Sequence, residues 1–135
     1  MARSGPVLAI VAALALAGIG AGAIANQAES HRREVARVKA LTGGDPDRGR
    51  TAIAARPCGG CHQIPGVPGA QGKVGPSLAG FSGRLYIGGR RNNTPDNLIQ
   101  WIEDPHQIDP QNAMPPMGVG EAEARDIAAY LETLK

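Results

Sequence analysis

Residues 58–62 read CGGCH and contain the only two cysteines of this 135-residue chain. Two cysteines separated by two residues can form a redox disulfide, supply half of a zinc site, or attach covalently to a haem. Each of these outcomes requires a different fold around it, so this motif constrains the chain more than any other feature. The histidine that follows the second cysteine has to be explained as well.

The first two chemistries find little support elsewhere in the sequence. A structural zinc site needs four ligands, and the chain has neither a second C-x-x-C nor an H-x₃₋₅-H pair. A thioredoxin-like dithiol belongs to a βαβ setting, which the sequence does not show. Covalent attachment explains all three side chains, because Cys58 and Cys61 would form thioethers and His62 would bind the iron. The motif therefore predicts one haem c, with its iron, held by two thioether bonds.

The composition suits a chain that folds around such a group. Glycine and proline together account for 30 residues, which predicts long loops, and aromatic residues make up only 3%. A large, flat, apolar cofactor can take the place of an ordinary core. Residues 42–135 carry nine basic and ten acidic side chains, and this near balance argues against nucleic acid as a partner.

The N-terminal segment is open to two interpretations. Residues 6–25 form an apolar run of 20 residues, which is long enough to span a membrane. Ala23-Ile24-Ala25 also fits the small-x-small pattern of a signal cleavage site. In either case Arg3 is expected to stay on the cytoplasmic side and the rest of the chain to be exported. The protein is thus expected on the periplasmic side of a bacterial inner membrane, anchored, or soluble after cleavage near Ala25.

The chain divides into three parts by composition. Residues 1–25 are expected to form a membrane anchor or signal peptide, residues 26–41 a helical stalk or linker, and residues 42–135 the haem domain. Membrane contact through residues 6–25 follows if the segment is not cleaved.

The haem domain is predicted to be all-α, with three main helices. Asp45-Pro46 and Thr94-Pro95 each place a capping side chain before a proline, which is typical of a helix start. The first helix is expected to end near Ala55, the second before Pro105, and the third to run over residues 121–134. Long loops separate them, and no strand is predicted.

The second axial position of the iron has three candidate ligands after residue 62: His106, Met114 and Met117. The segment from residue 112 to 117 reads NAMPPM, and its prolines fix φ, so it can present a thioether with little entropy left to lose. Histidine–methionine ligation would raise the reduction potential. Each methionine can equally be core filler under a loop.

Residues 42–135 resemble the class I c-type cytochromes, small monohaem electron carriers of bacterial respiratory chains. The resemblance rests on CGGCH, on GPSLAG at residues 75–80, on NTPDNLIQWIEDP, and on AMPPMGVG followed by DIAAYL. It implies the fold of that family, with three main helices and long loops wrapped around one covalent haem. It also implies that the aromatic ring of the last helix, Tyr130, packs over Gly49.

The resemblance implies roles for individual residues. The Pro76 carbonyl would accept a hydrogen bond from His62 Nδ1, Arg84 would lie near a propionate, and Met114 is favoured over Met117 as the distal ligand. The expected cofactor-binding set is Cys58, Cys61, His62, Pro76, Leu78, Arg84, Trp101 and Met114, with His62 and Met114 as metal ligands.

The resemblance further implies a one-electron carrier that is not an enzyme and has no small-molecule substrate. Its expected partners are a quinol–cytochrome c reductase and a terminal oxidase. One alternative is a permanent haem c subunit of a larger oxidase or dehydrogenase complex, with residues 26–41 as a docking helix. A second is a five-coordinate haem enzyme or gas sensor, in which Met114 would not bind the iron.

Overall fold

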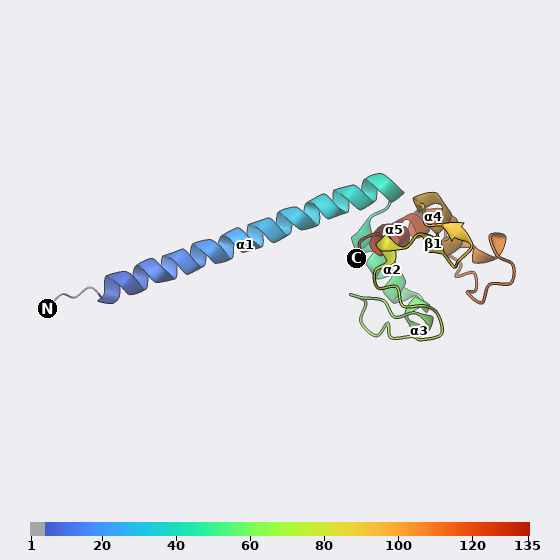
Figure 1. Cartoon of the computed structure of the whole chain (residues 1–135), viewed down its shortest axis with the longest axis horizontal. Helices are drawn as coiled ribbons and strands as arrows, with labels where there is room; N and C mark the ends of the chain where they lie inside the picture. Colours follow the sequence, from blue (N-terminus) through green and yellow to red (C-terminus); the bar gives the residue numbers. More distant parts are fainter. Residues whose placement is uncertain (1–4) are drawn as a thin grey trace. The chain divides into compact units, whose positions relative to one another are not determined.

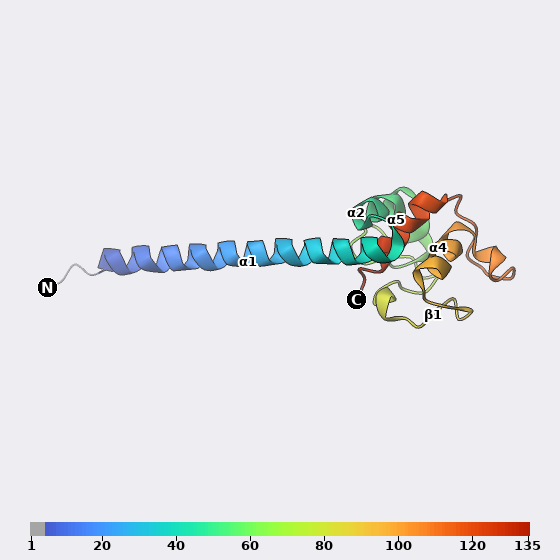
Figure 2. The ribbon, with the colours of Figure 1, turned by 90° about the horizontal axis from the view of Figure 1, so that it is seen from above.

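The computed structural model describes residues 5–135, so Arg3 lies outside the described residues. The chain divides into two units, residues 1–34 and residues 35–135 (Figures 1 and 2). The elements in chain order are α1 (Gly5–Thr42), α2 (Pro46–Ala55), α3 (Cys58–Cys61), the 3-10 turn η1 (Phe81–Gly83), β1 (Tyr86–Ile87), β2 (Arg91–Asn92), α4 (Pro95–Glu103), the 3-10 turn η2 (Pro105–Gln107) and α5 (Glu121–Leu131). Helices predominate, as the all-α prediction requires.

The first unit consists of most of α1. From Val7 onward this helix is long and apolar enough to cross a membrane, and its apolar stretch is exposed throughout. A signal sequence near the N-terminus has the same character, so length and composition alone fit both interpretations made above.

The last turns of α1 belong to the second unit. Val38 and Thr42 are buried, and Thr42 Oγ1 donates a hydrogen bond to the Val38 carbonyl over 2.8 Å. Arg37 donates from Nη2 to the Glu132 carbonyl, also over 2.8 Å. The compact unit therefore includes the end of the segment that the sequence analysis assigned to a stalk.

The starts of α2 and α4 confirm the capping prediction. Asp45 accepts hydrogen bonds from the two backbone amides of Asp47 and Arg48, and Thr94 accepts one from the amide of Asn97. Each capped helix begins with a proline, whose fixed φ suits the first helical position.

Two details differ from the sequence-based expectation. The last helix ends at Leu131 and not at residue 134, because the amides of Thr133 and Leu134 bond three residues back and tighten the chain into turns. A short hairpin also forms, pairing β1 with β2 in antiparallel register. Gly88 and Gly89 both have positive φ, which permits the tight turn between strands too short to show a sequence pattern.

Helix α5 packs against both α2 and α4 and forms the centre of the second unit. A Cβ at Gly49 would clash with the backbone carbonyl of Asp126, so the glycine lets α2 and α5 approach closely. The atoms nearest to Gly49 thus belong to the α5 backbone, and not to the Tyr130 ring that the resemblance places over this glycine. The Tyr130 hydroxyl donates to the Pro65 carbonyl over 2.6 Å. These three helices contribute buried side chains to one core, among them Ile53, Leu98, Ile102 and Ile127.

Candidate functional site

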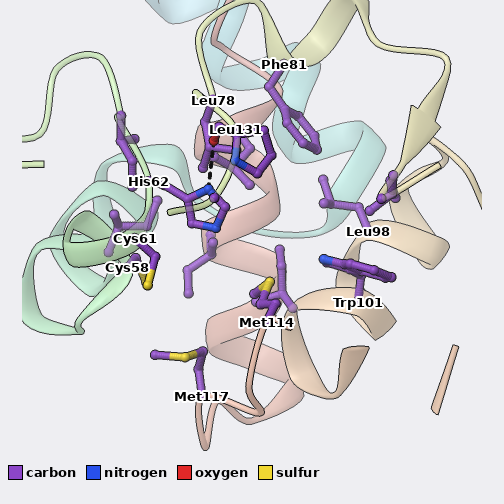
Figure 3. Close-up of a pocket in the computed structure, with 18 of the residues that line it drawn as sticks. Cys58, Cys61, His62, Leu78, Phe81, Leu98, Trp101, Met114, Met117 and Leu131 are labelled. Atoms are coloured by element: carbon purple, nitrogen blue, oxygen red, sulfur yellow. Dashed lines mark hydrogen bonds between the residues drawn. The ribbon is translucent and has the colours of Figure 1, made fainter. Parts of the chain in front are cut away.

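A cavity of about 430 Å³ opens in the second unit, between α2, α4, α5 and two loops (Figure 3). Its volume lies within the usual range of ligand pockets, roughly 300–1,000 Å³. The eight residues predicted to bind the cofactor all line it: Cys58, Cys61, His62, Pro76, Leu78, Arg84, Trp101 and Met114. The structure thus brings together side chains from residue 58 to residue 114 around one space.

The attachment segment, residues 58–62, consists of the single helical turn α3 and the histidine that follows it. Residues three apart lie on the same face of a helix, so Cys58 and Cys61 can present both thiols to the same side. Both cysteines are free thiols, and burial raises the pKa of the Cys58 thiol, which favours its protonated form. The chain leaves the turn in an extended conformation at His62, whose amide donates to the Cys58 carbonyl over 2.9 Å.

The His62 ring is held in one orientation. Its Nδ1 lies 2.8 Å from the Pro76 carbonyl oxygen, the contact that the resemblance implied (Figure 3). A carbonyl can only accept, so Nδ1 carries the proton and Nε2 keeps a lone pair free to bind a metal. Gly75 lies directly beside the ring, and a Cβ there would come within 2.7 Å of Nδ1.

The proximal loop, residues 63–80, is fixed by backbone hydrogen bonds to the attachment segment and within the loop itself. Gly72 and Gly75 donate their amides to the carbonyls of Gly59 and Cys61, over 3.0 and 2.8 Å. The Leu78 amide donates to the Gln63 carbonyl over 2.8 Å. The position of Pro76 behind His62 is therefore a property of the backbone.

Arg84 reinforces this loop. Its guanidinium donates to the Ser77 carbonyl and, over 3.5 Å, to the Ala79 carbonyl. It also lies over the Phe81 ring, 5.2 Å from the ring centre. The same side chain lines the cavity. Its predicted contact with a propionate stays a prediction.

The distal loop, residues 109–120, supplies both methionines to the cavity lining. The Met114 amide donates to Asn112 Oδ1 over 2.7 Å, and His106 Nε2 lies 3.0 Å from the Asn112 carbonyl. Arg56 Nη1 donates to the Met117 carbonyl over 2.9 Å. Of the three ligand candidates in the described chain, His106 does not line the cavity, because its ring nitrogen is turned to a backbone carbonyl.

The donor set fits a covalently held haem. Two thiols, one oriented imidazole and two thioethers line a cavity whose remaining walls are largely apolar. A zinc site does not fit, because no group of three or more histidine, cysteine or acidic side chains able to hold a metal ion occurs among residues 5–135. Thioether formation at Cys58 and Cys61 would use both thiols.

Two side chains that shape this site have no role that the sequence alone predicts. Arg56 reaches the distal loop from the end of α2, and Asn112 caps the Met114 amide. An asparagine side chain often accepts a hydrogen bond from the backbone amide two residues later, so the contact between Asn112 and Met114 is predictable from the sequence. Arg56 carried no such signal, because its contacts lie more than sixty residues away.

Comparisons with known proteins agree with this chemistry. The family model described as Cytochrome c matches residues 46–135. Cytochrome c oxidase subunit 2 of Bacillus sp. (strain PS3) is 35% identical over 65 residues, a stretch that covers 47% of this chain. The same stretch covers 18% of that subunit, so the chain corresponds to only a small part of this relative's length.

Proposed function

The chain belongs to the cytochrome c family, whose members transfer electrons through haem, and from this premise we propose that it carries single electrons in a bacterial respiratory chain. Its all-α fold, with loops around one cavity, is the fold of that family. When bound, the haem supplies an iron that alternates between Fe(III) and Fe(II).

Each side chain of the cavity has a proposed task in that role. Cys58 and Cys61 would hold the group covalently, and His62 would bind the iron through Nε2 while Pro76 keeps the imidazole ring oriented. Met114 would bind the iron as well, so that the protein would keep the same ligands in both oxidation states. Leu78 and Trp101 contribute apolar wall, and Arg84 lines the same cavity, where its guanidinium would pair with a propionate.

One observation supports this proposal above the others: Cys58, Cys61, His62 and Met114 line the same cavity. With His62 and Met114 both bound to the iron, the protein would leave no coordination position for a substrate or a gas. This favours an electron carrier over a five-coordinate enzyme or sensor.

The partners proposed are a quinol–cytochrome c reductase upstream and a terminal oxidase downstream. Residues 1–25 would anchor the protein, and residues 42–135 would form the haem domain on the periplasmic side. Residues 26–41 would form a stalk whose last turns pack against the haem domain through Val38 and Arg37. The exposed apolar stretch of α1 supports the anchor. A tether of this kind raises the effective concentration of the carrier near partners in the same membrane.

A second candidate is a permanent haem c subunit of a larger oxidase, and the likeness to an oxidase subunit favours it. Purification from detergent-solubilised membranes distinguishes the two. A free carrier is expected to elute alone and to restore electron flow between separately purified reductase and oxidase. Stoichiometric co-purification with an oxidase would replace the carrier proposal with the subunit.

The ligand assignment is tested by the visible spectrum of the reduced protein with and without carbon monoxide. We expect no change on mixing in the wild-type protein or in M117A, and only a slow reaction afterwards. M114A should bind carbon monoxide and show a lower reduction potential, because the thioether that favours Fe(II) is lost. The reverse behaviour of the two variants would assign Met117 as the ligand.

A further inference from the structure

Two arginines join α2 to α5 with the same geometry. Arg48 donates from Nε and Nη2 to the two carboxylate oxygens of Asp126, each over 2.8 Å. Arg56 donates from the same two nitrogens to Glu123, over 2.8 and 2.5 Å. Hydrogen bonding to the arginine lowers the pKa of each carboxyl from its ordinary value.

The two bridges differ in what else the arginine reaches. Arg56 uses its remaining nitrogen, Nη1, for the Met117 carbonyl, and 27% of its side chain is exposed. Arg48 makes no contact with the distal loop in the hydrogen bonds and ion pairs found over residues 5–135, and 65% of its side chain is exposed. Only the Arg56 bridge therefore links the helix pair to the methionines.

The backbone of Arg56 is itself well placed. It caps the C-terminal end of α2, and its amide donates to the Ile53 carbonyl over 3.3 Å. Cys58 follows two residues later. The side chain thus runs from the start of the attachment segment across to the distal loop.

The stretch between the two methionines transmits this anchoring. Pro115 and Pro116 separate Met114 from Met117, and proline fixes φ at each of these positions. Fixing the Met117 carbonyl at one end of so stiff a segment restricts where the Met114 side chain can lie at the other. Asn112 fixes the opposite side of Met114 through its amide.

From these contacts we propose that Arg56 is a positioning residue for the distal loop, which keeps Met114 closed over the cavity by holding the Met117 carbonyl. The inference rests on the proposed function, in which Met114 is the second axial ligand. It assigns Glu123 the task of orienting the guanidinium so that Nη1 points at the loop. Lysine cannot replace Arg56, because its single ammonium nitrogen cannot bind both carboxylate oxygens of Glu123 and the Met117 carbonyl together, as the three guanidinium nitrogens do.

The test compares R56Q and R56K with R48Q in the full-length, haem-loaded protein. The measurement is the rate at which the reduced protein binds carbon monoxide, with the reduction potential and urea unfolding recorded alongside. All three variants lose or weaken an α2–α5 bridge, so all three are expected to unfold at lower urea. Only R56Q and R56K are expected to bind carbon monoxide faster than wild type, by about tenfold for R56Q, since a charged hydrogen bond to the loop is lost.

Equal carbon monoxide rates in R56Q and R48Q would overturn the inference and leave the proposed function intact. A wild-type protein that binds carbon monoxide as fast as M114A would overturn the proposed function itself. If R56Q does not accumulate as folded protein, R56K and E123Q carry the test. Both keep part of the contact, and either one binding carbon monoxide no faster than R48Q would contradict the role of Arg56.

Discussion

The two loops that close the cavity are held by different means. The proximal loop is fixed by its own backbone amides, which donate to carbonyls of the attachment segment and of the loop itself. Across the described residues, no backbone–backbone hydrogen bond joins residues 113–119 to the rest of the molecule. The distal loop depends on side chains of four residues: Arg56, Arg90, His106 and Asn112. The histidine side is thus set by the fold, whereas the methionine side is set by a few replaceable residues.

Alanine substitution of one glycine in each loop, Gly75 and Gly118, is expected to give the largest difference between the loops in stability and reduction potential. In G75A the new methyl group would collide with the His62 ring, because a Cβ there lies within 2.7 Å of Nδ1. The ring has to turn and its hydrogen bond to the Pro76 carbonyl is lost. Overpacking of this kind costs about 1–3 kcal/mol, and the lost hydrogen bond adds about 1 kcal/mol.

The matched variant is G118A in the distal loop. Gly118 has a φ of 62°, and no atom lies within 4 Å of the position that an alanine methyl group would take, so only backbone strain opposes the change. That strain is worth about 1–2 kcal/mol. Urea unfolding and the reduction potential measure both effects, and we expect G75A to change the potential and G118A to change stability alone. Similar potentials in the two variants would remove the distinction between the loops.

Substitution of Asn112 is expected to have an intermediate effect on stability and on carbon monoxide binding, confined to the distal loop. In N112A the Met114 amide loses its acceptor, at a cost of about 1 kcal/mol, and carbon monoxide should bind to the reduced protein several-fold faster. In N112D the side chain keeps an oxygen at the same position, so this variant should behave like wild type. Protection of the His62 side, read from hydrogen exchange of the Gly75 amide, should be the same in all three proteins.

Lowering the pH is expected to have the smallest effect on carbon monoxide binding, and to act on the distal loop alone. The proximal loop contains no carboxylate, whereas the distal loop is held through the Arg56–Glu123 bridge. The pKa of Glu123 is lowered in the folded protein by its hydrogen bonds to Arg56, from an ordinary value of 4.5. Its contribution is therefore complete above about pH 4.5 and is lost as the pH falls below that value through the folded pKa.

The carbon monoxide rate should accordingly rise modestly as the pH is lowered through this range, with the protein still folded. The effect is small because protonated Glu123 frees Arg56 from one partner without removing its hydrogen bond to Met117. E123Q should show the faster rate at neutral pH and no further rise in acid. A rise of equal size in E123Q would attribute the acid effect to another group.

Local chemistry made much of this fold predictable. The starts of α2 and α4 follow from one capping side chain and one proline each, and both lie within three residues of sequence. The attachment segment is equally local, since Cys58, Cys61 and His62 are nearly adjacent. Such features depend on neighbours in the chain, and the sequence shows those neighbours directly.

The remaining features depend on contacts between distant segments. The sequence of the last turns of α1 is typical of a solvated stalk, and only the buried side chains of Val38 and Thr42 show that these turns pack. The hairpin of β1 and β2 has two residues in each strand, too few for an alternating pattern. Arg56 and Glu123 look like two ordinary surface charges until the helices that carry them meet.

The close approach at Gly49 has a consequence for how the chain folds. Helices α2 and α5 lie near opposite ends of the second unit's sequence, and Arg56 and Glu123 are 67 positions apart. Their first contact has to close a loop of that length, an entropic cost that falls on this one step. Afterwards α4 and both cavity loops have to close only shorter loops within that span. The slow event in folding is thus expected to be the meeting of the two ends, because nonlocal contacts limit the folding rate.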